Sequence, residues 1–501
     1  MGDEVRPEER SRASDTDSSP NTPRSSHSGR LLTNSVRVFV AEALMVPSGL
    51  IVAAYLARHL EPDGYGLFVL ALTITVWVEW SVVSLFARQT IKLVSEADDW
   101  RGVGAAAVRQ SLFTSLLAGV ALCVAAYPLA YLLDAPLLGA YLCLFALDIP
   151  LFALARTHRN ILVGLEEVDE RALVAAARWI VRPILIVLLV ECGLSIAGAI
   201  TGSVCATLAE LLLLRRYVRP SFARPENIPA RTVWRGAAPL ALAAMSLRLF
   251  NRIDLIALKA LGGTAVAAGI YGAAQQVALL PNLFGLSFAP LLMATLARLL
   301  RRDKLEEARE TAGDAMRAVV LLLPLASLVA GAAPELAPLL FGEKFAAAAA
   351  PLAVLIFGAL ALLMVSVATS IFTAASLPSR AFQLTAPLVL SAAIAHFFVI
   401  PRFGMFGAAI VTTAVATSGA LAAVLLVYQL WRVAPPRLTL LRAVLVSIAA
   451  YALAAYVPTA GWWVVLKLCS GAALCALALL SSGEFTKQEI ALLSTLIRRK
   501  S

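Results

Sequence analysis

Ionisable side chains interrupt several long apolar stretches of this 501-residue sequence, and they are the groups in it that could do chemistry. A charged group costs about 2.5–3.5 kcal/mol at the centre of a membrane helix on insertion scales, so such residues mark ligand or ion pathways. The candidates are Glu42, Glu79, Asp148, Arg182, Glu210, Arg248, Arg252, Asp254 and Lys467.

Four polar residues, Arg248, Asn251, Arg252 and Asp254, fall within two turns of one apolar segment. Positions three and four apart are neighbours on a helix surface, so these side chains share roughly one face. Guanidinium groups match phosphate and pyrophosphate in geometry and charge. The predicted substrate-binding residues are therefore Arg182, Arg248, Arg252 and Asn251.

The acids in the same region could carry a coupling ion, either a proton or Na⁺. The predicted ion-coupling residues are Asp254, Asp148, Glu42 and Glu79. A structural alternative stays open, in which Arg182–Asp148 and Arg252–Asp254 neutralise one another and hold the helices together. Lys467 falls close to the end of its apolar segment, where a lysine is typical of an interfacial anchor.

The motifs of soluble enzymes are absent from the sequence. It contains no GxxxxGK[ST] loop, no HExxH and no CxxC, and its six cysteines are scattered. We therefore predict no ATPase site, no metal and no cofactor, apart from possible coupling to an H⁺ or Na⁺ gradient. The protein is predicted not to be an enzyme, and its net charge of +10, spread over many loops, does not indicate a nucleic-acid partner.

The composition identifies the solvent that must surround the elements holding these residues. Hydrophobic residues make up 60% of the chain, charged residues 15%, and the mean hydropathy is +0.82, far from a soluble domain. Because a bilayer core needs about 20 apolar helical residues per crossing, we predict an all-α membrane protein of about fourteen spans. They are placed at 35–57, 65–86, 109–133, 136–155, 172–190, 194–214, 236–258, 265–297, 317–340, 349–374, 382–401, 404–430, 440–458 and 462–481.

The positive charges alternate between successive loops. The loops predicted to face outward hold only Arg58, Lys259, Lys344 and Arg402, and most of the 42 lysines and arginines fall on the other side. Because positive residues favour the cytoplasmic side, this pattern predicts both termini in the cytoplasm. The chain is therefore expected to be a multi-pass protein of the cytoplasmic (inner) membrane, in contact with its lipids.

The spans divide into two sets, and two segments suggest an internal duplication. Tyr65-Gly66 recurs 206 residues later as Tyr271-Gly272, and the segment 195–207 resembles 405–417 at an offset of 210. The predicted parts are a disordered tail (1–34), a first lobe (35–214), a basic loop (215–235), a second lobe (236–431), two extra spans (432–481) and a C-terminal tail (482–501). The linker 299–316 is expected outside the membrane, and an amphipathic helix is expected from Thr486.

Several segments, in order, resemble one family: the polysaccharide exporters of the multidrug/oligosaccharidyl-lipid/polysaccharide (MOP) superfamily. They are YLARHLEPDGYGLFVLA (55–71), NRIDLIAL (251–258), GIYGAAQQV (269–277), LLFGEKFAAAAAPLAVLIFG (339–358) and FGMFGAAIVTTAVAT (403–417). The resemblance implies two six-helix, MATE-like lobes around a central cavity, with two additional C-terminal helices. Asp254 and Tyr271-Gly272 match the family pattern, and Arg88 matches a basic position in it.

The resemblance also implies a function. Its members flip lipid-linked glycans, typically on undecaprenyl pyrophosphate, for lipopolysaccharide or exopolysaccharide synthesis, so the expected partners are a lipid-linked glycan and possible polysaccharide assembly enzymes. One alternative is a cation-coupled multidrug or metabolite exporter of the same superfamily. A second is a membrane polysaccharide polymerase or ligase, which the short outer loops disfavour.

Overall fold

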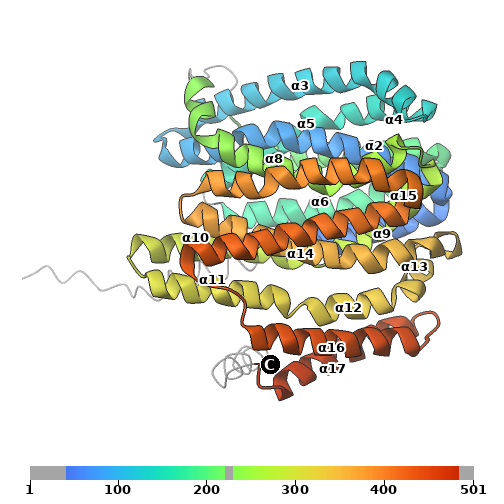
Figure 1. The fold of residues 1–501 in the computed structure, drawn as a ribbon. Helices are drawn as coiled ribbons and strands as arrows, with labels where there is room; N and C mark the ends of the chain where they lie inside the picture. Colours follow the sequence, from blue (N-terminus) through green and yellow to red (C-terminus); the bar gives the residue numbers. More distant parts are fainter. Residues whose placement is uncertain (1–40, 166, 221–229, 485–501) are drawn as a thin grey trace, which may run out of the picture.

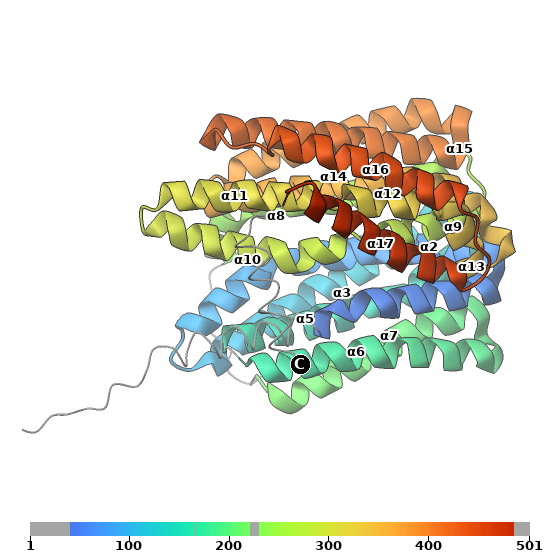
Figure 2. The same ribbon diagram turned by 90° about the horizontal axis from the view of Figure 1, so that it is seen from below.

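The computed structural model describes residues 41–165, 167–220 and 230–484. The predicted tail 1–34, the helix expected from Thr486 and the middle of the basic 215–235 loop lie outside the described residues. Within them the protein is almost entirely helical, and Figure 1 and Figure 2 show helices running side by side along one common direction.

The first group of helices, which we call the N-lobe, precedes the 221–229 gap. It contains α2 (Met45–Glu96), α3 (Trp100–Leu132), α4 (Pro136–Ala146), α5 (Asp148–Gly164), α6 (Val168–Leu189), the π-helix η1 (Val190–Leu194) and α7 (Ser195–Tyr217).

The second group, the C-lobe, is followed by two further helices. It contains α8 (Ala230–Ala260), α9 (Ala265–Ala278), α10 (Asn282–Arg301), α11 (Leu305–Val320), α12 (Leu323–Gly331), α13 (Ala333–Phe341), the 3₁₀ helix η2 (Glu343–Ala348), α14 (Ala349–Ala374) and α15 (Pro378–Trp431). The two further helices are α16 (Arg437–Tyr456) and α17 (Trp463–Ser481).

The two longest helices are each broken at one residue. A straight helix of the 52 residues of α2 would measure about 78 Å, more than twice the apolar thickness of a bilayer. In α2 the break is Glu61 (φ 57°), followed by Pro62, and in α15 it is Gly404 (φ 54°). Proline removes a helical hydrogen bond and glycine accepts a positive φ at little cost, so both breaks have a local cause. Figure 1 shows the two halves of α15 side by side.

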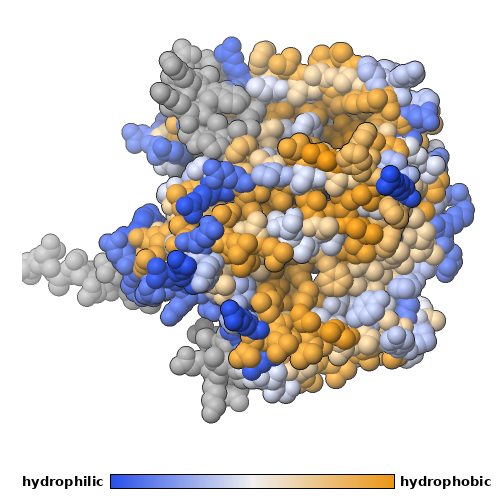
Figure 3. Space-filling model, in the orientation of Figure 1, coloured by the Kyte–Doolittle hydropathy of each residue, from blue (hydrophilic) through white to orange (hydrophobic). Residues whose placement is uncertain are grey.

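The surface of the bundle is that of a membrane protein. Nine helices in the described part of the chain are long and apolar enough to cross a bilayer. Figure 3 shows a broad apolar band between two ends where the polar side chains gather. On α3 the large apolar side chains Phe113, Val124 and Tyr131 are more than 60% exposed, as expected for residues that face lipid. The protein is therefore an all-helical, multi-pass membrane protein, and the count of fourteen spans stays a prediction.

The two lobes meet along α2 and α9 with almost no space between their backbones. A Cβ atom added to Gly66 would lie 1.9 Å from the carbonyl oxygen of Ala265, and one added to Gly269 would lie 2.1 Å from that of Pro62. We call this contact the α2–α9 seam. Beside it, Arg58 donates to the carbonyl oxygens of Leu339 (2.6 Å) and Leu340 (3.2 Å), so α2 also holds the end of α13.

Some helix boundaries differ from those predicted. The expected span 265–297 is interrupted at residues 279–281, where Pro281 precedes α10. The linker expected at 299–316 is mostly helical, because α10 continues to Arg301 and α11 begins at Leu305. The fourth expected span ends at 155, whereas α5 continues to Gly164 with buried residues along its added length.

The helices α16 and α17 pack on α12 of the C-lobe and are tied to it by a buried acid. Glu484, which follows α17, accepts from Arg317 (2.8 Å), Thr439 (2.5 Å) and Arg442 (3.0 Å). We call this group the Glu484 clamp. Burial opposes ionisation of the carboxyl, but the hydrogen bonds from Thr439, Arg317 and Arg442 outweigh it and hold the pKa of Glu484 below its usual value.

Candidate functional site

A cavity of about 330 Å³ lies between the two lobes. Its walls come from α2 and α6 on the N-lobe side and from α8, α9, α14 and α15 on the C-lobe side. Aromatic and aliphatic side chains line much of the wall, and the polar groups concentrate on α6, α8 and α9. A mostly apolar cleft with a few convergent polar groups is typical of a ligand site.

All four predicted substrate-binding residues line this cavity. Arg182 reaches it from α6, whereas Arg248, Asn251 and Arg252 reach it from α8. In the described part of the chain no carboxylate lies within 4.0 Å of the guanidinium nitrogens of these arginines, and the buried ion pairs there involve other residues. The structure therefore brings three unpaired guanidinium groups from both lobes to one chamber.

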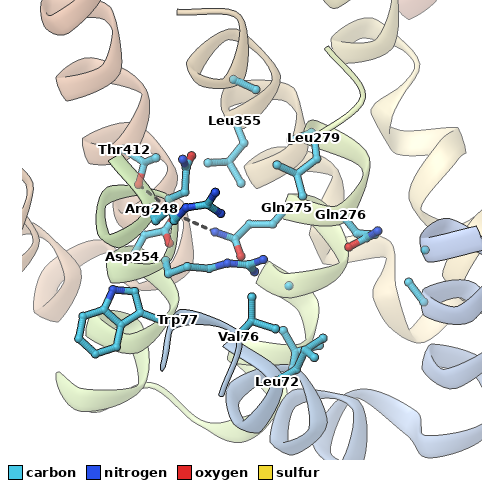
Figure 4. Close-up of a pocket in the computed structure, with 18 of the residues that line it drawn as sticks. Leu72, Val76, Trp77, Arg248, Asp254, Gln275, Gln276, Leu279, Leu355 and Thr412 are labelled. Carbon is cyan, nitrogen blue, oxygen red and sulfur yellow. Dashed lines mark hydrogen bonds between the residues drawn. The ribbon is translucent and has the colours of Figure 1, made fainter. Parts of the chain in front are cut away.

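Asp254 lies in the same wall but is satisfied by neutral donors. Its carboxylate accepts from the hydroxyl of Tyr271 (2.7 Å), the amide of Gln275 (2.8 Å), the hydroxyl of Thr412 (3.2 Å) and the backbone N–H of Leu255 (2.8 Å). Figure 4 shows Thr412 and Gln275 converging on Asp254, with Arg248 extending beside Gln275. Asp254 therefore does not form the direct pair with Arg252 that the structural alternative requires.

Glu79 of α2 and Asp148 of α5 do not line the cavity. Both are about 95% buried, and their carboxyl groups contact each other, near Arg182. Arg182 and Asp148 do not reach ion-pair distance in the described structure, so the second pair of the structural alternative is absent there as well. The geometry leaves Arg182 directed into the cavity.

Glu42, the remaining predicted ion-coupling residue, belongs to a buried network away from the cavity. It accepts from Arg159 (3.2 Å) and lies 4.0 Å from Arg171. Arg159 and Arg178 both pair with Glu210, which links α5, α6 and α7. Each carboxylate of this network is shared between two arginines, which is the pattern of a structural ion-pair group.

Lys467 was expected at the membrane interface, and this prediction is wrong. Only 8% of the residue is exposed, and its Nζ donates to the carbonyl oxygens of Ala454 (3.0 Å) and Val457 (3.1 Å) and to the carboxylate of Glu335. A cation at the C-terminal end of a helix satisfies carbonyl groups that have no helical partner. Lys467 therefore closes the end of α16 and joins it to α13.

Sequence reasoning missed an aromatic group at the cavity. Trp80 lines the wall from α2, and its ring lies 4.1 Å from the guanidinium carbon of Arg248 and 4.6 Å from that of Arg156 on α5. Trp77 lines the cavity one turn earlier. The only signal in the sequence is the order Trp77-Val78-Glu79-Trp80, and tryptophan in an apolar stretch is usually a packing residue.

The sequence pattern of a protein family described as polysaccharide biosynthesis protein matches residues 31–296, more than half of the chain. The chain belongs to this family. By sequence it matches no curated protein. The matched region covers the N-lobe and part of the C-lobe, including the cavity residues of α2, α6, α8 and α9.

Several solved structures share the fold of this chain. The lipid II flippase MurJ in an inward closed conformation superposes with a TM-score of 0.68 at 14% identity, covering 89% of this chain and 98% of that one. A MOP superfamily transporter from Pyrococcus furiosus gives a TM-score of 0.57 at 14% identity, over 80% and 95% of the two chains. An inward-facing MATE transporter gives 0.55 at 15% identity, over 83% and 95%. The resemblance to the MOP superfamily is confirmed at the level of fold.

Proposed function

We propose that this polysaccharide biosynthesis protein is a flippase that moves a lipid-linked oligosaccharide, of the undecaprenyl pyrophosphate type, across the cytoplasmic membrane. The observation that carries the proposal is the cavity between the lobes with Arg182, Arg248 and Arg252 in its walls and no carboxylate paired with them in the described residues. Three unneutralised guanidinium groups attract an anion, and their donor geometry suits a diphosphate.

The arrangement of the lobes supports a route for such a cargo. The diphosphate and glycan would pass through the polar cavity while the lipid tail stays among the acyl chains outside the bundle. Release on the other side requires the α2–α9 seam to part while the opposite side closes. Similar folds are described in inward-facing and outward-facing conformations, which supports an alternating-access cycle for this chain.

Asp254 is the residue that we assign to ion coupling in this cycle. It is 1% exposed and accepts hydrogen bonds from α8, α9 and α15, so a proton or Na⁺ bound there would change how these helices are held. Glu79 and Asp148 form a second candidate proton site in the N-lobe. We further propose that both termini are cytoplasmic and that polysaccharide assembly enzymes use the product.

The experiment is transport of a fluorescent lipid-linked glycan by purified protein in proteoliposomes. Replacing Arg182, Arg248 or Arg252 with methionine should reduce the initial rate by at least about tenfold, because each change removes a charged contact with the diphosphate. The matched control is Arg402→Met, since Arg402 is exposed and does not line the cavity. Full activity of all three cavity variants would contradict the proposed route.

A cation-coupled exporter of drugs or metabolites is the second candidate, supported by the fold shared with MATE transporters. The unpaired arginines count against it, because they repel cationic cargo. The same proteoliposomes loaded with a cationic dye separate the two functions. Dye export without glycan movement would favour the exporter. No feature of the cavity favours a polymerase or a ligase.

A further inference from the structure

The indole of Trp80 touches guanidinium groups from both lobes. The ring lies under Arg156 of α5, with 4.6 Å between its centroid and the guanidinium carbon, and under Arg248 of α8 at 4.1 Å. Trp80 and Arg156 belong to the N-lobe, whereas Arg248 belongs to the C-lobe. A cation over an aromatic face is attracted by the negative face of the ring, most strongly for tryptophan. The stack is therefore an electrostatic link across the cavity.

The ring of Trp80 is held in place by residues of its own lobe. Phe152 of α5 packs edge-on against Trp80, with 5.5 Å between the ring centroids, and Arg156 also lies over Phe152 at 5.1 Å. These contacts come from the N-lobe alone. Trp80 is thus supported by N-lobe residues, and Arg248 of the C-lobe packs against its ring.

Arg248 has a neighbour of like charge on its own helix. Arg252 lies four residues further along α8, so the two guanidinium groups are neighbours of like charge and repel each other. Among the described residues no carboxylate lies within ion-pair distance of Arg248. The contact with Trp80 therefore helps to hold its head group in the cavity wall.

A guanidinium group held against an aromatic face keeps its N–H donors for another partner. We infer that Trp80 is a positioning residue for anion binding: it holds Arg248 so that its donors meet the diphosphate of the cargo, and it couples that contact to the approach of the lobes. The inference rests on the proposed function for the identity of the cargo. The chemistry it assigns is a diphosphate group, carried by a lipid or free.

The test measures binding of two probes, inorganic pyrophosphate and farnesyl diphosphate, to the purified full-length protein by calorimetry. Trp80→Leu removes the aromatic face and should weaken binding of both by about 2- to 30-fold, the range that a cation–π contact covers. Trp80→Phe should recover most of the affinity. The matched control is Trp463→Leu, because Trp463 is 68% exposed at the start of α17.

A double-mutant cycle with Arg248→Met separates positioning from a general structural role. If Trp80 acts through Arg248, Trp80→Leu has no further effect once Arg248 is methionine. A full loss in that background, wild-type affinity of Trp80→Leu, or no binding of either probe by the wild-type protein would overturn the inference.

The outcomes distinguish this inference from the proposed function. Diphosphate binding that depends on Trp80 and Arg248, without movement of lipid-linked glycan in proteoliposomes, keeps the inference and rejects the flippase. Glycan movement together with binding that ignores Trp80 keeps the flippase and rejects the inference. Tighter binding of farnesyl diphosphate than of pyrophosphate identifies a lipid as the carrier of the anion.

Discussion

Replacing Gly66 with alanine is expected to prevent the two lobes from closing along the α2–α9 seam. The new Cβ atom would lie 1.9 Å from the carbonyl oxygen of Ala265 and 2.9 Å from the backbone nitrogen of Gly269. A Cβ atom does not approach a non-bonded heavy atom closer than about 3.0 Å, and both obstacles are backbone atoms that cannot swing aside. The two helices must therefore move apart by at least about 1 Å, which lies within the shifts that overpacked cores undergo.

The energetic size of this change follows from the cost of overpacking. An added methyl group in a tight core costs about 1–3 kcal/mol, which corresponds to roughly a 5- to 150-fold shift away from the closed arrangement. The matched control is Gly64→Ala on the same helix. A Cβ atom there would meet only side chains of Leu60 (3.2 Å) and Ile196 (3.5 Å), both in the N-lobe.

Cross-linking across the lobes measures this closure directly. Glu61 of α2 and Lys344 of η2 form an ion pair at 2.5 Å, and both side chains are about 65% exposed. Cysteines at these two positions should be joined rapidly by a short bifunctional thiol reagent in the otherwise wild-type chain, with the linked peptides identified by mass spectrometry. Adding Gly66→Ala should slow the reaction at least fivefold, whereas Gly64→Ala should not. Equal rates in all three would refute the idea that this seam closes the lobes.

Three further predictions concern the buried charges. Glu484→Gln should lower the thermal stability at neutral pH. Because the folded pKa of Glu484 is depressed, its contribution is present above its usual pKa of 4.5 and is lost as the pH falls through the folded value, so the melting temperatures of both proteins should converge in acid. Lys467→Met should destabilise the protein, because it removes the cation paired with Glu335 and the donor to two carbonyl groups, measured by the same melts against Lys344→Met. Asp254→Asn should lower the melting temperature, because only one oxygen remains to accept from the buried donors, and should abolish the dependence of glycan transport on an imposed H⁺ or Na⁺ gradient. Retained dependence in the folded variant would exclude Asp254 as the coupling site.

The helices and the cavity arginines could be predicted from the sequence because both depend on local patterns. Length and hydropathy define membrane helices, and charge inside an apolar segment must face away from lipid. Arg248 and Arg252 stand one turn apart, so placing one in the cavity places the other near it. This local logic accounts for the predicted substrate residues all lining one chamber.

The partners of the charges could not be predicted, because they are set by packing between distant segments. Arg159 meets Glu42, 117 residues away, and no spacing rule indicates that pair. The fourth predicted span ends at residue 155, just before Arg156 and Arg159, yet α5 continues through both. Hydropathy averaged over a window ends a helix at its first charges, even where those charges are buried and paired.

Helix breaks at a single residue could not be predicted from the sequence for a related reason. The conformations of Glu61 and Gly404 change the direction of α2 and α15 without changing the mean hydropathy of either helix. Lys467 shows the opposite error, because a lysine near the end of an apolar segment is usually an anchor at the interface. Here Lys467 is buried because it pairs with the carboxylate of Glu335, which lies 132 residues away in the sequence.

The distribution of acids around the cavity explains why it should be selective for an anion. Burying a charge is costly unless it is paired. In the N-lobe, Arg159 and Arg178 are paired with the carboxylate of Glu210. Among the described residues that line the cavity the acid is Asp254, which is instead satisfied by three neutral side chains and forms no ion pair with the cavity arginines. A diphosphate entering between the lobes would supply the missing negative charge to groups on both sides. In the proposed flippase the free energy gained by that pairing would be largest when the lobes are close together, so a bound diphosphate would favour the closed arrangement.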